Sequence, residues 1–200
     1  MSNAPIRCAD AVAATFAVAL LAAVALAAVV PGADARTLPA IASPNAASNG
    51  GAVAGTPISK LTAPGAKARL TRTGLAIPPA DAPAKVRAVI RAGNEIARTP
   101  YKWGGGHGLL EDSGYDCSGS ISFALRKARL MTASLASGGF MGWGRRGRGR
   151  WITIRANGGH AYMVVAGLRF DTSARKVSGN RWSAQMRSPR GYVATHPPGL

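Results

Sequence analysis

Residues 36–80 limit what the chain can fold into, because they contain few side chains that can build a hydrophobic core. The segment consists mainly of alanine, proline, glycine, serine, threonine and asparagine, and its isolated apolar residues follow neither a helical nor a strand period. Such a composition buries too little apolar surface to offset the entropy of ordering the chain. We therefore expect a disordered linker over residues 36–80 and one folded domain over residues 81–200, a common size for an independently folding unit.

The first 35 residues have the order of a secretory signal. Arg7 precedes an apolar run over residues 11–30, which is followed by Pro31-Gly32 and by the small-residue triplet Ala33-Asp34-Ala35. A basic start, an apolar stretch, a helix break and an Ala-x-Ala site predict export and cleavage after residue 35. The alternative is an uncleaved anchor, since about 20 apolar residues suffice to span a bilayer.

Apolar spacing and capping residues predict two helices at the start of the folded domain. Asp81 as N-cap and Pro83 in the first turn begin a helix that we expect to end near Thr99-Pro100. A second helix follows Asp116 and carries Cys117 in its first turn. Extended runs rich in β-branched residues then predict three strands, over residues 151–155, 160–166 and 168–172. Helices followed by strands predict an α+β domain with a small antiparallel sheet.

Cys117 is the one cysteine of the processed chain, because Cys8 leaves with the signal. An unpaired thiol in an exported protein is either buried and inert or reactive. The first turn of a helix favours the thiolate, which makes Cys117 a candidate nucleophile. The chain has no closely spaced cysteine and histidine set of the kind that binds structural zinc. We expect no metal and no cofactor.

A nucleophile needs a base, and three histidines compete for that role. His107 lies in the glycine-rich stretch Gly104–Gly108, a flexible setting that positions a side chain poorly. His196 is close to the C-terminus and is expected at the surface. His160 opens an apolar strand, where the backbone is rigid and borders loops that a substrate can reach. His160 is therefore the candidate base.

Asp171 is the one acidic residue after Asp116 and is the candidate partner of His160. A hairpin that turns at residues 166–167 places Ser173 opposite His160 and puts Asp171 on the same face, two residues away. A register shifted by one residue would move Asp171 to the other face. The alternative is an ordinary aspartate beside a turn.

Together these residues predict acyl transfer, most simply amide hydrolysis. Cys117 would attack a carbonyl, His160 would carry the proton to the leaving amine, and Asp171 would hold the imidazole in the required tautomer. Backbone N–H groups of Cys117 and Ser118 would stabilise the oxyanion.

Two motifs and the strand that follows them resemble a known family. Tyr101-Lys102-Trp103-Gly104-Gly105, then Gly114-Tyr115-Asp116-Cys117-Ser118-Gly119-Ser120, and then the strand headed by His160, are similar to the NlpC-like cell-wall cysteine peptidases over about residues 82–200. The resemblance implies a papain-like α+β fold with N-terminal helices packed on a small antiparallel sheet. It also implies secretion to the bacterial envelope and hydrolysis of peptide bonds in peptidoglycan stem peptides, commonly between D-glutamate and a diamino acid.

The resemblance also implies roles for individual residues. Cys117 would be the nucleophile, His160 the base and Asp171 the third polar residue. Three further residues would lie at the substrate, with Tyr101 beside the nucleophile and the other two in contact with the stem peptide: Tyr101, Asp116 and Ser118.

The chain has 25 Lys and Arg against 8 Asp and Glu, a net charge of +17 that predicts an anionic partner. Its densest basic stretch, over residues 143–151, stands before the His160 strand, where the family usually has a Leu-x-Pro-Gly-Asp stretch. Arginines among glycines and aromatic residues can bind single-stranded nucleic acid, but export makes nucleic acid an unsuitable partner. The alternatives are attraction to anionic wall polymers or to the carboxylates of stem peptides, or a solvated loop without a specific ligand.

Our leading hypothesis is a secreted, monomeric peptidoglycan endopeptidase that meets the membrane only through its signal segment. One alternative is a non-catalytic cationic protein that binds or organises the wall. Another is an amidase or acyltransferase that uses the same cysteine and histidine.

Overall fold

The structure, a computed structural model, describes residues 61–200. The signal segment over residues 1–35 and the linker up to residue 60 lie outside the described residues. Residues 61–80, which we expected to belong to the linker, contain a hairpin of β1 (Arg69–Leu70) and β2 (Ala76–Ile77). The disordered linker over 36–80 was thus predicted too long at its C-terminal end. Hydrogen bonds to other segments fix this hairpin, and hydrophobic periodicity does not reveal them.

Several hydrogen bonds attach the hairpin to the rest of the domain. The backbone of Ala76 exchanges two hydrogen bonds with the side-chain amide of Asn94, at 2.9 and 2.8 Å. The N–H of Ala68 donates to the carbonyl of Ala166 at 2.9 Å. The ordered unit therefore starts well before residue 81.

The first predicted helix is α1 (Ala84–Glu95), which buries Val86, Val89 and Ile90. Its N-cap is Pro83, without a side-chain hydrogen bond, so the predicted cap at Asp81 was wrong. The carbonyl of Pro83 accepts the first helical bond, from Arg87 N–H, which leaves Asp81 too early in the chain to cap. The helix also ends earlier than the expected Thr99-Pro100.

The second helix, α2 (Cys117–Lys127), is confirmed with its predicted cap. The carboxylate of Asp116 accepts a hydrogen bond from Gly119 N–H at 2.7 Å, which satisfies one of the free amides of the first turn. Residues 118–125 of α2 are all buried. This helix is therefore a central element of the domain, with the thiol at its first residue.

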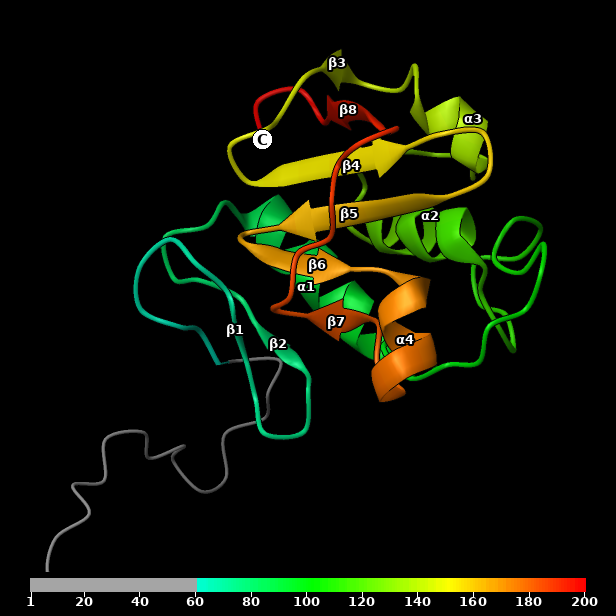
Figure 1. Cartoon of the computed structure of the whole chain (residues 1–200). Helices are drawn as coiled ribbons and strands as arrows, with labels where there is room; N and C mark the ends of the chain where they lie inside the picture. Colours follow the sequence, from blue (N-terminus) through cyan, green and yellow to red (C-terminus); the bar gives the residue numbers. More distant parts are fainter. Residues whose placement is uncertain (1–60) are drawn as a thin grey trace, which may run out of the picture. The chain divides into compact units, whose positions relative to one another are not determined.

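The sheet has six strands in the order β3-β8-β4-β5-β6-β7, and every neighbouring pair is antiparallel (Figure 1). The strands are β3 (Arg145–Arg146), β4 (Ile152–Ala156), β5 (Ala161–Val165), β6 (Leu168–Phe170), β7 (Trp182–Ser183) and β8 (Val193–His196). Two short helices are α3 (Ser137–Phe140) and α4 (Thr172–Ser178). The α+β class with an antiparallel sheet is confirmed, while β3, β7 and β8 were not predicted.

The hairpin of β5 and β6 has the predicted turn. Val165 pairs with Leu168, and the two turn residues, Ala166 and Gly167, have φ of 46° and 87°. Positive φ at both positions is the requirement of a type I′ turn, which suits the twist of the flanking strands. The predicted strand over residues 168–172 ends at Phe170, because Asp171 caps α4. Ser173 is consequently in a helix and does not pair with His160 in the sheet.

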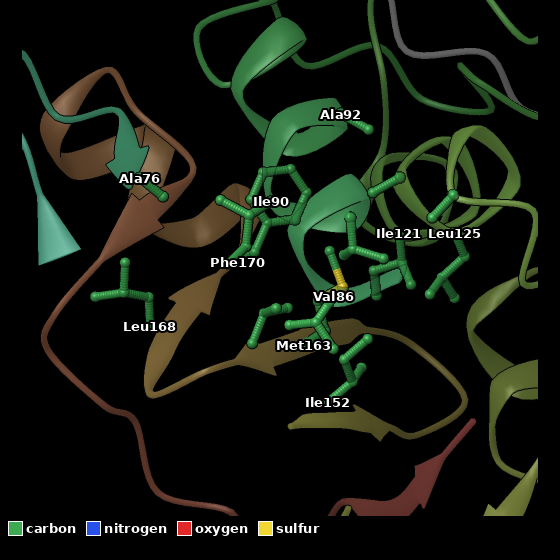
Figure 2. Packing of buried hydrophobic residues seen from close by; sticks show 14 of the residues in the cluster. Ala76, Val86, Ile90, Ala92, Ile121, Leu125, Ile152, Met163, Leu168 and Phe170 are labelled. Carbon is green, nitrogen blue, oxygen red and sulfur yellow. The ribbon is translucent and has the colours of Figure 1, made fainter. Parts of the chain in front are cut away.

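The core lies between the sheet and the two longer helices. Figure 2 shows Val86 and Ile90 of α1 and Ile121 of α2 packed against Ile152 and Met163 of the sheet. The opposite face of the sheet is crossed by residues 184–192, which run from β7 to β8 (Figure 1). Within residues 61–200, no helix is both long and apolar enough to cross a membrane.

Candidate active site

Cys117 is half-buried at the start of α2, beside three polar neighbours. Its Sγ lies 3.4 Å from Oγ of Ser137 in α3. The side chain of His160 and the backbone N–H of Ala161 lie close enough to the sulfur to lower its pKa. The thiol is thus held at the meeting point of α2, α3 and β5.

His160 is placed by the turn that joins β4 to β5. Oδ1 of Asn157 accepts hydrogen bonds from the N–H groups of Gly159 and His160, at 3.0 and 2.9 Å, and so fixes the backbone just before β5. The imidazole Nε2 lies 3.0 Å from Oδ1 of Asp171. A carboxylate only accepts, so Nε2 donates and Nδ1 is the ring nitrogen left for the thiol. The predicted meeting of His160 and Asp171 is confirmed.

Asp171 reaches His160 as the N-cap of α4 rather than from a strand. Its side chain is fully buried and also accepts from the N–H and Oγ of Ser173 and from Nη1 of Arg187, at 2.9, 2.7 and 3.1 Å. Burial alone would raise the pKa of this carboxyl, but the hydrogen bonds from His160 and Ser173 hold the pKa well below its usual range. Asp171 is therefore a fixed negative charge behind the imidazole.

The same contacts lower the pKa of the Cys117 thiol and raise the pKa of the His160 imidazole. Burial would raise the pKa of Cys117, but hydrogen bonds from His160, Ser137 and Ala161 lower it to about 7. Burial would lower the pKa of His160, but its bonds to Asp171 and Cys117 raise it to about 9. Between these two values the pair is a thiolate beside an imidazolium, which is the reactive form of a nucleophilic cysteine.

A cavity of about 430 Å³ opens beside the thiol. It brings together residues from both sequence motifs and from the loops before α3 and β5: Tyr101, Trp103, Gly104, His107, Asp116, Cys117, Ser118, Ala136, Ser137, Gly138, Gly158 and Gly159. Tyr101 is half exposed and Trp103 almost fully exposed. Burial, together with the negative charges of Cys117 and Asp116, raises the pKa of Tyr101, so its hydroxyl stays protonated beside the sulfur.

The carboxylate of Asp116 holds together the loop that precedes the thiol. It accepts from the N–H groups of Gly104 and Gly119, from Oγ of Ser118 and from Nε2 of His107, all within 3.1 Å. A Cβ on Gly119 would overlap the carbonyl oxygen of Gly105, so this close approach requires glycine. The glycines of the two motifs thus allow the loop to lie directly against the start of α2.

His107 was wrongly expected to be poorly positioned. Its Nε2 lies 3.0 and 3.1 Å from the two carboxylate oxygens of Asp116 and 3.3 Å from Oγ of Ser118. These partners are 9 and 11 residues away in the sequence, and no local sequence pattern predicts them. His196, by contrast, lies in β8, where its Nδ1 is 3.2 Å from the carbonyl of Gly147, and it takes no part in this site.

The backbone offers donors next to the sulfur. The first N–H groups of a helix have no partner within the helix. Those of Cys117 and Ser118 donate no hydrogen bond within residues 61–200. Together with the positive end of the helix dipole, they can stabilise negative charge on an oxygen beside the thiol.

Sequence reasoning missed Ser137 and Arg187, which touch Cys117 and Asp171 from distant segments. Residues 61–200 contain no group of three or more His, Cys, Asp or Glu side chains that could hold a metal ion. Comparison of the chain with protein-family models, with curated proteins and with solved structures finds no match.

Proposed function

We propose that this protein is a secreted cysteine endopeptidase that hydrolyses amide bonds in peptidoglycan stem peptides, with a papain-like domain of the NlpC type. The observation that carries the proposal is the line of contacts from Cys117 through His160 to Asp171, beside an open cavity. A thiol that only filled the core would have no need of a hydrogen-bonded imidazole and a buried carboxylate behind it.

In this proposal the Cys117 thiolate attacks the carbonyl carbon and the carbonyl π electrons move to oxygen. The N–H groups of Cys117 and Ser118 stabilise that oxyanion. When the tetrahedral intermediate collapses, the C–N bond breaks and the His160 imidazolium gives its proton to the leaving amine. Neutral His160 then takes a proton from water, which attacks the thioester and releases a carboxylic acid and the thiolate.

Substrate contacts follow from the cavity beside the thiol. Tyr101 and Ser118 present hydroxyl groups there, and Asp116 presents the cavity's carboxylate. Asp116 already accepts bonds from within the protein, including one from His107. A stem-peptide amine that binds Asp116 would therefore join or replace the bond from His107.

The test is incubation of the full chain with purified muropeptides and analysis of the products by mass spectrometry. We expect a stem-peptide amide to be cut by the wild type and not by Cys117→Ser. Cys8→Ser, at the only other cysteine of the chain, is the matched control and should keep the activity. A released side-chain amide or a transferred acyl group would instead indicate an amidase or an acyltransferase.

Charge supports a second proposal, attraction to anionic wall polymers. Residues 129–200 hold 12 Lys and Arg and a single acid, the buried Asp171. Among these bases, Arg148, Arg155 and Arg187 line a cavity of about 210 Å³ on the outer face of the sheet. If the wild type binds purified walls but cleaves no muropeptide, the non-catalytic wall-binding alternative replaces the enzyme.

A further inference from the structure

A second cavity shares Tyr101 with the cavity of the thiol. It has a volume of about 420 Å³ and is lined by Tyr101 and His160 together with residues of α4: Thr172, Ser173, Arg175 and Lys176. Tyr101 and His160 join it to the reacting groups, since Tyr101 also lines the cavity of Cys117 and His160 lies beside the sulfur. A molecule that fills this cavity would therefore lie beside the imidazole.

The charged side chains of this cavity are positive. Nε and Nη2 of Arg175 donate to the carbonyl of Arg98, at 3.3 and 3.2 Å, which anchors the guanidinium and leaves Nη1 without a partner among the described residues. Lys176 is exposed, and within residues 61–200 neither base has a carboxylate within 4.0 Å. Asp171 is fully buried behind His160 and Arg187, so it does not present its charge to this space.

The charges of the two cavities indicate which half of a substrate each cavity would bind. The cavity of Cys117 contains the carboxylate of Asp116, whereas the cavity of α4 contains Arg175 and Lys176. The leaving amine receives its proton from His160, so the leaving half departs on the His160 side. The leaving half would therefore lie beside Arg175 and Lys176.

We propose that the cavity formed by α4, Tyr101 and His160 binds the leaving half of the substrate and selects an amino acid that carries a free carboxylate. Arg175 and Lys176 bind the carboxylate, and the ring of Tyr101 with the methyl group of Thr172 contacts the aliphatic part. The inference rests on the amide hydrolysis proposed above and adds the chemical class of the product amine. An anchored guanidinium suits this role because a carboxylate accepts two parallel N–H bonds.

The experiment compares two stem tripeptides that differ only in the leaving amino acid, which ends in a free carboxylate in one and in a carboxamide in the other. We expect the wild-type full chain to cleave the acid with a kcat/KM about tenfold higher than the amide. Arg175→Gln and Lys176→Gln should each reduce this preference, and the double variant should abolish it. Arg190→Gln, which removes an exposed charge elsewhere, should keep the full preference.

A second measurement separates the two proposals. The free leaving amino acid and its amide are titrated into the protein and followed by NMR, which requires no catalysis. Tighter binding of the acid, lost in Lys176→Gln, supports the carboxylate site even if no peptide is cleaved and the peptidase proposal fails. Equal kcat/KM for acid and amide overturns the carboxylate site if peptides are cleaved, and equal binding of the two free forms overturns it whether or not they are. Because the exposed side chain of Lys176 makes no hydrogen bond within residues 61–200, its variant should fold normally.

Discussion

Replacement of Arg181 by methionine should destabilise the domain strongly, although arginine is usually a surface residue. Arg181 is completely buried and has no carboxylate partner among the described residues. Its guanidinium donates instead to five acceptors from the end of α1, the segment before Tyr101 and the start of α2: the carbonyls of Ile96, Thr99, Pro100 and Tyr115 and Oγ of Ser120. It therefore ties together the chain segments that carry Tyr101 and Cys117.

The magnitude follows from the acceptors that the variant would leave unpaired. Ile96 O and Pro100 O keep a second donor, from Thr99 N–H and Tyr115 N–H. Thr99 O and Tyr115 O have no other partner within the described residues, and each buried unpaired acceptor costs about 1–3 kcal/mol. Burial lowers the pKa of Arg181 to about 10, so methionine also removes the cost of a buried charge. We expect a net loss of about 2–4 kcal/mol in the free energy of unfolding.

Urea denaturation of the full chain measures this loss as a lower midpoint at an unchanged slope. Arg181→Lys keeps the charge with fewer donors and should fall between the wild type and Arg181→Met. Arg190→Met, at an exposed position, is the control and should stay within about 0.5 kcal/mol of the wild type. If Arg181→Met loses less than about 1 kcal/mol, the five hydrogen bonds do not stabilise the domain as we reason.

Three further predictions concern the candidate site and the basic surface. Because the reactive form needs a thiolate at Cys117 and a proton on His160, kcat/KM should rise as the pH passes about 7 and fall as it passes about 9, and a sigmoidal profile without the alkaline fall would contradict the ion pair. Asp171→Asn removes the charge that raises the pKa of His160, so kcat should fall by about 10²- to 10⁴-fold and the pH profile of thiol alkylation should shift upward. Unchanged alkylation would show that Asp171 does not act through the imidazole. The double variant Arg148→Gln with Arg155→Gln should bind purified walls less tightly and with less dependence on salt, measured by co-sedimentation, while muropeptide cleavage is retained. Wall binding equal to that of the wild type would exclude this cavity as the attachment surface.

The predictable parts of the fold are those with local signals. The helix from Cys117 has its cap one residue before it, and the turn at residues 166–167 follows from the strands on either side. The strands β3 and β8 have two and four residues, and they pair with each other across the domain, as in the pairing of Arg145 with His196. No short window of sequence contains both members of such a pair, so periodicity cannot identify them. The strand β7 has only two residues, too few to show a period.

The site divides in the same way. Cys117, His160 and Asp171 were recognisable because each combines a reactive residue type with a cap or a strand end. His107 and Arg181 act through long-range hydrogen bonds that hold Gly-rich or irregular segments in place, and such segments have no hydrophobic period. Where backbone carbonyls and a single carboxylate hold a loop, the sequence shows the participants but not their pairing.

The shortage of acidic residues also has a structural explanation. Residues 61–200 hold six acids, and five of them form ion pairs or hydrogen bonds within the domain: Glu95, Glu111, Asp112, Asp116 and Asp171. Asp112, Asp116 and Asp171 bind the loop before α2 and the imidazole, whereas Glu95 and Glu111 pair with Lys127 at the surface. Most surface arginines of residues 61–200 have no carboxylate partner. Neutralising Asp116 or Asp171 should therefore disturb the site, whereas neutralising an exposed arginine away from it, such as Arg190, should weaken only attraction to an anionic partner. Comparing variants that neutralise these acids with variants that neutralise exposed arginines can therefore separate catalysis from wall binding.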